Sequence, residues 1–427
     1  MTATRRPAGT AGTATPARIR SLLVTLVLLS LAWGAVGGWA VSEHSSAASA
    51  AVTVDEPLSL DARQLYESVA DADVTITTAF LASSRPPLAP LQRYQDDIAT
   101  ASADLAGLRT AEGSQSLTAA LATLTGGIPR YTGYVADAES EYSLGYPLTG
   151  GSFTQVASEE AHLVLLPAAK TVFTQENASL SAASGQATGL ATIIVALVLA
   201  VITAITLYRA QRWLTRRTNR VVNPGLGLAT VLLVISAVWL VAAFGVARPD
   251  LDRGIGQGSQ PAATLAQASI GIQQIRGDAV LNVISRSGDT SFQQDFLATS
   301  KLVGPGPGTL LTGAASGTAD SLVAAADREA TAWYAANAGV YRLGAAADYA
   351  AERTMVIGTG DGSSAAGYTA LESDITQAIA DDQSVFRSAA TAGADALDPL
   401  MPMVIVASLL MALGCAWGLT RRLAEYR

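Results

Sequence analysis

Four apolar runs, each about 20 residues long, decide what this chain can fold into. They cover approximately Ile19–Val41, Gly189–Tyr208, Gly225–Val246 and Leu400–Leu419. At roughly 1.5 Å per residue, a helix of this length crosses the roughly 30 Å hydrocarbon core of a bilayer. The sequence therefore predicts a membrane protein with four transmembrane helices.

The charges beside these runs predict their orientation. Twelve arginines near the ends of the runs, counting Arg20 at the edge of the first, are accompanied by one acid, Glu425. The segments 42–188 and 247–399 carry 17 acidic residues each, against 6 and 9 basic residues. Short arginine-rich loops stay in the cytoplasm. We expect a multi-pass protein of the cell membrane with both termini cytoplasmic.

This topology divides the chain into nine parts. They are a cytoplasmic arm (1–18), a first span (19–41), an extracytoplasmic helical domain (42–188), a second span (189–208), an Arg-rich cytoplasmic loop (209–224), a third span (225–246), a second extracytoplasmic domain (247–399), a fourth span (400–419) and a cytoplasmic tail (420–427). Ala48-Ser49-Ala50 resembles a signal-peptide cleavage site. The first apolar run is longer than the usual signal core of about 7–15 residues, which favours an uncleaved anchor.

The fold class predicted from the pattern is all-α. Both outer segments are rich in Ala, Leu, Gln and Asp and contain few alternating β-branched residues. We expect two four-helix-bundle-like domains with one core each, whose first and last helices continue into the spans. Ser30 and Trp33 in the first span recur as Ser236 and Trp239 in the third, which indicates an internal duplication with an offset of about 210 residues.

Composition also argues against several classes of function. Acidic outer segments disfavour nucleic acid and anionic lipid headgroups as ligands. The single cysteine, Cys415, excludes an intramolecular disulfide and a cysteine-based zinc site. Neither His44 nor His162 has a metal-ligand spacing, and we expect His162, beside Glu160, to lie solvated on an exposed helix. We predict no enzyme activity, no catalytic residue, no metal and no cofactor.

Three groups of residues are candidates for contacts. The first is the set of arginines in the middle loop, which set topology and attract anionic lipid, or which dock a cytoplasmic protein: Arg209, Arg212, Arg216, Arg217 and Arg220. The second is a set of aromatics that pack between helices or contact a partner protein: Tyr131, Tyr134 and Tyr341. The third is a set of small residues in spans that favour close helix packing, within the chain or in a homo-oligomer: Gly34, Gly38, Gly414 and Gly418.

The chain resembles a known actinobacterial type of membrane protein. Lys170 and Lys301 are its only lysines, and a chain rich in Ala, Gly and Arg with so little Lys is typical of a GC-rich actinobacterial genome. Four spans, two acidic outer domains and very short inner segments resemble the membrane component of an amino-acid-sensing system. The resemblance implies a solute-binding lipoprotein of the glutamine type as the outer partner and a soluble serine/threonine kinase as the inner partner.

Three hypotheses of function follow. The first is a non-enzymatic relay that passes the state of an amino-acid-binding lipoprotein across the bilayer to the kinase. The second is a direct sensor of the chemoreceptor type, with a small ligand between the outer helices. The third is a scaffold for envelope assembly or division that has no ligand. The sequence alone does not choose among them.

Overall fold

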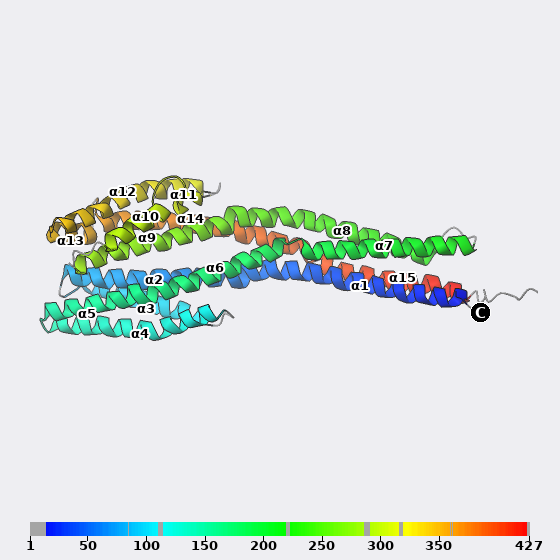
Figure 1. Ribbon diagram of the computed structural model, residues 1–427, viewed down its shortest axis with the longest axis horizontal. Helices are drawn as coiled ribbons and strands as arrows, with labels where there is room; N and C mark the ends of the chain where they lie inside the picture. The colour runs from blue at the N-terminus through cyan, green and yellow to red at the C-terminus, as the bar shows by residue number, and fades with distance from the viewer. Residues whose placement is uncertain are drawn as a thin grey trace, which may run out of the picture. The chain divides into compact units, whose positions relative to one another are not determined.

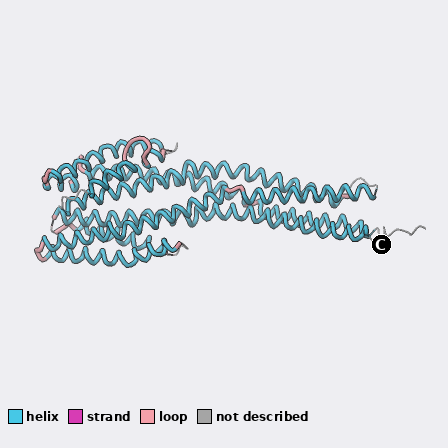
Figure 2. Tube along the Cα trace, viewed as in Figure 1, coloured by secondary structure: helices cyan, strands magenta, loops and turns pink. Residues whose placement is uncertain are grey.

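The computed structural model describes residues 14–83, 85–109, 114–218, 223–285, 291–315, 319–358, 360 and 362–424. Helices and short turns account for these residues, and no strand occurs among them (Figure 2). Four helical runs are long and apolar enough to cross a membrane, namely Arg18–Ala82, Pro147–Arg216, Pro224–Ile284 and Ser364–Arg421. The prediction of an all-α protein with four such helices is confirmed.

The chain divides into two compact units. The apolar unit comprises residues 1–49, 184–252 and 390–427, and the polar unit comprises residues 50–183 and 253–389. We call 50–183 segment 1 and 253–389 segment 2. Each of the four long helical runs belongs partly to one unit and partly to the other.

Four helices build the apolar unit: α1 (Ala14–Ala50), α7 (Ala191–Thr218), α8 (Pro224–Gly254) and α15 (Leu400–Ala424) (Figure 1). Their buried faces meet in a core that includes Leu26, Leu207, Leu233 and Met411. Trp33 is fully buried there, and its indole N–H donates to the hydroxyl of Ser236 at 3.2 Å. This bond joins α1 to α8 through two of the residues that recur in the sequence.

Glycines mark the places where these helices approach most closely. A side chain at Gly34 would run into Ser408 of α15, and a Cβ at Gly38 would lie 3.7 Å from Ile405. A Cβ at Gly414 would lie 3.1 Å from the carbonyl oxygen of Gly225, and one at Gly418 would lie 3.1 Å from its Cα. All four predicted packing glycines therefore lie at contacts inside the chain, between α15 and either α1 or α8.

Segment 1 supplies five α-helices and two π-helical turns to the polar unit. They are the turn η1 (Ala51–Asp55), α2 (Glu56–Ala82), α3 (Leu88–Leu108), α4 (Gln115–Ser143), α5 (Pro147–Glu160), the turn η2 (Ala161–Leu165) and α6 (Leu166–Thr188). Segment 2 supplies the turn η3 (Ile255–Ser259), α9 (Gln260–Ser285), α10 (Ser291–Val303), α11 (Leu310–Gly313), α12 (Asp320–Ala345), α13 (Tyr349–Ile357) and α14 (Ser364–Leu397).

The two segments pack against each other through α2 and α9. Val74 of α2 lies in one apolar cluster with Val280 of α9 and Val340 of α12, and the main core of the unit draws residues from both segments. The sequence led us to expect one core in each segment. In the structure the segments also share a core, because α2 and α9 each have apolar residues on the side that faces the other.

Polar contacts cross the same interface. The guanidinium of Arg276 on α9 pairs with Asp71 on α2, and both side chains are mostly buried, at 16% and 14% exposure. The same guanidinium lies over the ring of Tyr368, 4.1 Å from its centroid. Ser269 donates to Glu67 at 3.0 Å. The segments therefore form one cooperative unit by both apolar and ionic contacts.

Each of the three π-helical turns among the described residues ends two positions before a proline. After η1, η2 and η3, one residue donates its N–H five positions back, and the next residue is Pro57, Pro167 or Pro261. Proline has no N–H, and its ring collides with the carbonyl four residues earlier in an α-helix. The wider turn accommodates this carbonyl, so the helix continues past the proline.

Two of the long runs contain a short interruption. Residues 189–190 separate α6 from α7, and residues 398–399, which include Pro399, separate α14 from α15. The carbonyl of Gly189 lies 2.7 Å from Nε2 of His44, whose Nδ1 lies 2.8 Å from the carbonyl of Ala40. The imidazole thus supplies a partner to a carbonyl that the interrupted helix leaves without one.

Replacing Gly34 by leucine is expected to destabilise the apolar unit. The new side chain would overlap Ser408 of α15, and forcing extra volume into a packed contact costs about 1–3 kcal/mol. Thermal unfolding of the full-length protein in detergent measures the loss. Gly245→Leu is the matched control, because no atom lies within 4 Å of a Cβ at that position. Equal stability of the two variants would contradict the close contact.

Replacing Arg276 by methionine is expected to destabilise the polar unit by about 3–5 kcal/mol, because Asp71 would remain buried without its partner. Chemical denaturation of the full-length protein measures this free energy. Arg130→Met is the control, since Arg130 is 58% exposed in its pair with Glu160 and such pairs contribute about 0–1 kcal/mol. Adding Asp71→Leu to Arg276→Met should restore much of the stability, and a double variant no better than the single one argues against the pair.

Candidate functional site

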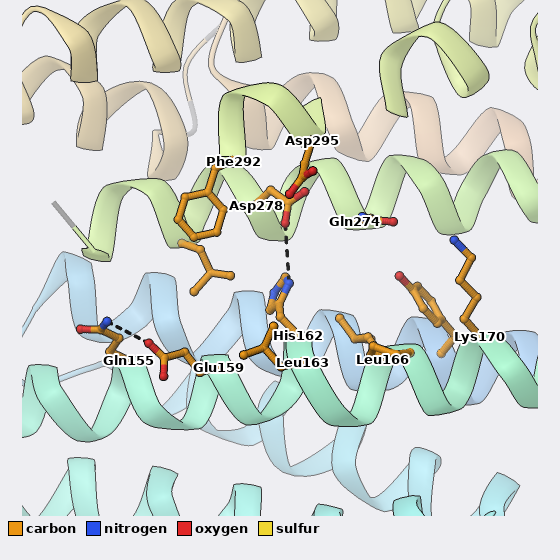
Figure 3. Close-up of a pocket in the computed structure, with 13 residues that line it drawn as sticks. Gln155, Glu159, His162, Leu163, Leu166, Lys170, Gln274, Asp278, Phe292 and Asp295 are labelled. Carbon is orange, nitrogen blue, oxygen red and sulfur yellow. Dashed lines mark hydrogen bonds and ion pairs between the residues drawn. The ribbon is translucent and has the colours of Figure 1, made fainter. Parts of the chain in front are cut away.

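A cleft of about 540 Å³ opens in the polar unit between segments 1 and 2. Its walls come from α2, from α5, η2 and α6, and from α9 and α10 (Figure 3). The polar residues that line it are Gln155, Glu159, His162, Lys170, Gln274, Asp278 and Asp295, and the apolar ones include Leu163, Leu166, Leu281 and Phe292. Volumes of roughly 300–1,000 Å³ are typical of small-molecule sites.

His162 is the central side chain of the cleft. Its Nε2 lies 3.4 Å from Oδ2 of Asp73 on α2, and its Nδ1 lies 3.8 Å from Oδ1 of Asp278 on α9. The imidazole is only 10% exposed. It fits against α9 because residue 277 is glycine, where a Cβ would lie 2.7 Å from Nε2. One histidine of segment 1 therefore bridges a carboxylate from each segment.

The surroundings shift the pKa values of this group. Burial lowers the pKa of His162, but hydrogen bonding to Asp73 and the charges of Asp73 and Asp278 outweigh it, so the pKa lies above the ordinary 6.5. Burial raises the pKa of Asp278 to about 6, against the lowering effect of the His162 charge and with a further increase from Asp295. The two neighbouring carboxyl groups thus favour the charged form of His162 more than water does.

In each of the two buried aspartates, one carboxylate oxygen has no hydrogen-bond partner among the described residues. Ser158 on α5 donates to Oδ2 of Asp73 at 2.7 Å. Oδ1 of Asp73 and Oδ2 of Asp278 are buried and accept no hydrogen bond from the residues that the structure describes. Buried carboxylate oxygens usually have partners. Asp278 lines the cleft, where its carboxylate contributes negative charge.

Helix geometry places the polar residues on the two walls. His162, Leu166 and Lys170 follow one another at intervals of four residues along η2 and α6, and all three line the cleft. Gln274 and Asp278 have the same spacing on α9. Lys170 reaches toward Gln274, whereas His162 faces Asp278 (Figure 3). The positive side chain and the carboxylates thus lie at different levels along the cleft.

The prediction for His162 was wrong. We expected a solvated residue on an exposed helix, but the imidazole is buried and paired with two aspartates. The reason is that the α5–η2–α6 run contacts helices on several sides, namely α2, α4 and α9. Polar residues on such a helix point into contacts with other helices, and the run of Glu159, Glu160 and His162 does not mark a solvent-facing surface.

The predicted aromatic contacts lie mostly inside the unit. Tyr131 and Tyr341 are 0% and 4% exposed, which rules out a partner-contacting surface for them in this structure. Tyr131 lies near Tyr94, with ring centroids 6.2 Å apart, and Tyr341 packs on Phe296 at 5.1 Å. Tyr134 is partly buried against the core. Packing between helices, the first of our two interpretations, describes these contacts.

The predicted arginines lie at the end of α7, which continues to Thr218. The expected loop 209–224 is therefore helical over much of its length. Arg209, Arg212 and Arg216 are exposed, Arg217 lies on the helix, and Arg220 falls outside the described residues. Within the part of the chain that the structure describes, no group of three His, Cys, Asp or Glu side chains is arranged to hold a metal ion.

Comparison with known proteins identifies one related domain. Residues 47–185 match the family model of the actinobacterial sensor domain. No curated protein and no solved structure matches the chain. The matched region includes all of the cleft residues that segment 1 contributes. Together with four helices able to cross a bilayer, the match supports an actinobacterial membrane protein of the sensor class.

The charge of His162 is expected to make stability depend on pH. Because its folded pKa is raised above 6.5, its contribution is fully present below pH 6.5 and is lost as the pH rises through the folded value. The difference in free energy of unfolding between wild type and His162→Gln should therefore shrink as the pH increases from 6.5. Denaturant titrations across this range measure it. Gln155→Ala, which removes no titratable group, should show a constant difference, and a constant difference for His162→Gln would refute the assignment.

Proposed function

We propose that this protein is a non-enzymatic membrane sensor that detects a small polar molecule in the cleft and signals to a separate cytoplasmic protein. The match of residues 47–185 to a sensor domain supports the general class. The cleft supports direct detection, because it combines apolar walls with a few polar groups.

One observation carries the proposal: both walls of the cleft lie on helices that lead into apolar helices. The α9 wall joins α8 through η3 without a break, so residues 224–285 are continuously helical. The α6 wall is separated from α7 only by residues 189–190. A ligand that contacts both walls favours one spacing of these helices over another, and this difference in affinity is what shifts a conformational equilibrium.

The output surface that we propose is the exposed side of α7 near its end. Arg209, Arg212 and Arg216 follow one another at intervals of three and four residues, which places them on one face of the helix. A face of this kind suits an acidic surface of a soluble protein or anionic lipid. It also favours the relay as a second candidate function, in which a solute-binding lipoprotein outside and a soluble serine/threonine kinase inside are the partners.

The test uses the full-length protein in lipid nanodiscs and a panel of small anions, cations, zwitterions and neutral polar molecules. At a ligand concentration of 100 Kd, binding stabilises the folded state by about 2.7 kcal/mol, which raises the unfolding temperature by several degrees. Amide hydrogen exchange in residues 209–218 reports whether binding is transmitted. We expect at least one class of molecule to change both measurements.

A pair of matched variants tests the location of binding. Leu163 lines the cleft and is 75% exposed, so Leu163→Trp should fill the cleft without disturbing the core. Leu148, on α5, is 88% exposed and does not line the cleft, which makes Leu148→Trp the control. Stabilisation should be lost in the first variant and kept in the second. Binding that leaves the exchange of residues 209–218 unchanged, or no binding by any class, would refute the proposed sensor.

A further inference from the structure

The cleft has a negative end and a positive end. Asp278 and Asp295 lie on α9 and α10 near His162, and Lys170 lies on α6 beyond Gln274, on the side away from His162 (Figure 3). Gln274 and Asp278 are four residues apart on α9, which corresponds to about 6 Å along the helix axis. Two groups of opposite charge thus face one cleft at different levels, one to two helical turns apart.

The negative end offers a specific acceptor. Asp278 is only 6% exposed, and its Oδ1 faces His162 whereas its Oδ2 accepts no hydrogen bond from any described residue. A buried acceptor of this kind is costly unless a donor reaches it. Asp295 adds a second carboxylate to the lining. A protonated amine complements the charge of these two carboxylates, since charge-assisted hydrogen bonds are the strong ones.

The positive end offers a donor. Lys170 forms no salt bridge with any residue that the structure describes, although it stands in a unit rich in acids. Its exposed ammonium group and the side-chain amide of Gln274 both supply N–H donors at this end of the cleft. A carboxylate is the simplest small group that accepts from both of them.

The space between the two ends is apolar. Leu166 lies between His162 and Lys170 on the same wall, and Phe292 and Leu163 contribute further hydrophobic surface. Methylene groups gain about 0.8 kcal/mol each when they are buried against such surface. A short aliphatic chain therefore fits the middle of the cleft.

We propose that the cleft selects a short ω-amino carboxylate, with the amine at Asp278 and the carboxylate at Lys170. This inference rests on the proposed function, for which it names the class of ligand. A dicarboxylate places a negative charge beside Asp278 and Asp295, and a diamine places a positive charge beside Lys170. Only the dipolar molecule matches the charge at both ends, and because these ends lie at least one helical turn, about 6 Å, apart, separated groups are favoured over a single α-amino acid backbone.

The test measures binding to the full-length protein in nanodiscs by calorimetry and thermal unfolding. The probes are 5-aminopentanoate, its singly charged counterparts pentanoate and pentylamine, and glycine as the short zwitterion. We expect 5-aminopentanoate to bind at least about ten-fold more tightly than the other three, because each of them lacks one contact or the required length.

Two variants assign the ends of the ligand. Lys170→Met should weaken 5-aminopentanoate about ten-fold or more and leave pentylamine unchanged, and Asp278→Asn should weaken 5-aminopentanoate and leave pentanoate unchanged. Lys301→Met is the matched control for Lys170, because Lys301 is exposed on α10 and does not line the cleft. The unfolding temperature without probe reports whether Asp278→Asn folds; Lys170 is at the surface, so its variant tests the inference in any case.

The outcomes separate this inference from the proposed function. Preference for 5-aminopentanoate that depends on Lys170 and not on Lys301 supports the ligand class. Equal or tighter binding of pentanoate, pentylamine or glycine, or equal effects of the two lysine variants, overturns it and leaves the sensor proposal standing. Tight binding of 5-aminopentanoate without a change of exchange in residues 209–218 supports the ligand class and overturns transmission.

Discussion

The polar unit contains in its interior a histidine that lies between two aspartates. Asp73 and Asp278 belong to different segments, about 200 residues apart in the chain, and His162 stands between them. Neither carboxylate is favourable in a packed interior without a positive neighbour, and burial alone disfavours the imidazolium. Each charge therefore stabilises the others, so the packing of α2 on α9, the protonation of His162 and the electrostatics of the cleft are coupled.

A proline and a π-helical turn determine the local structure around His162 in the long run from α5 to α6. Pro167 would end or kink an ordinary α-helix, but the π-helical turn at Ala161–Leu165 lets the run continue from α5 into α6. The turn also inserts an extra residue, which changes the side of the helix on which the following residues lie. His162 lies within that turn, and Lys170 lies after it. Pro57 and Pro261 likewise follow η1 and η3 inside otherwise helical runs.

The sequence predicted the helical class, the four apolar helices and the small residues at their contacts, because these depend on local composition and periodicity. Contacts between residues that lie far apart in the chain could not be predicted from the sequence. Nothing local connects Asp73 or Gly277 with His162, since their contact exists only after α2, η2 and α9 have packed. The prolines after the π-helical turns were a usable signal. For Tyr131 and Tyr341 the sequence left packing and partner contact both open, because aromatic residues are typical of helix cores as well as of interfaces.

The two walls of the cleft differ in how they connect to the apolar helices, and this difference bears on signalling. The α6 wall is followed by two non-helical residues before α7, so it can change its angle without breaking regular helix hydrogen bonds. The α9 wall is joined to α8 by unbroken helix, where bending would sacrifice such bonds. A ligand that draws the walls together would therefore move α6 about residues 189–190 more easily than it would bend α9. In the proposed sensor, displacement of the α8–α9 run as a whole is then the component that reaches the apolar unit.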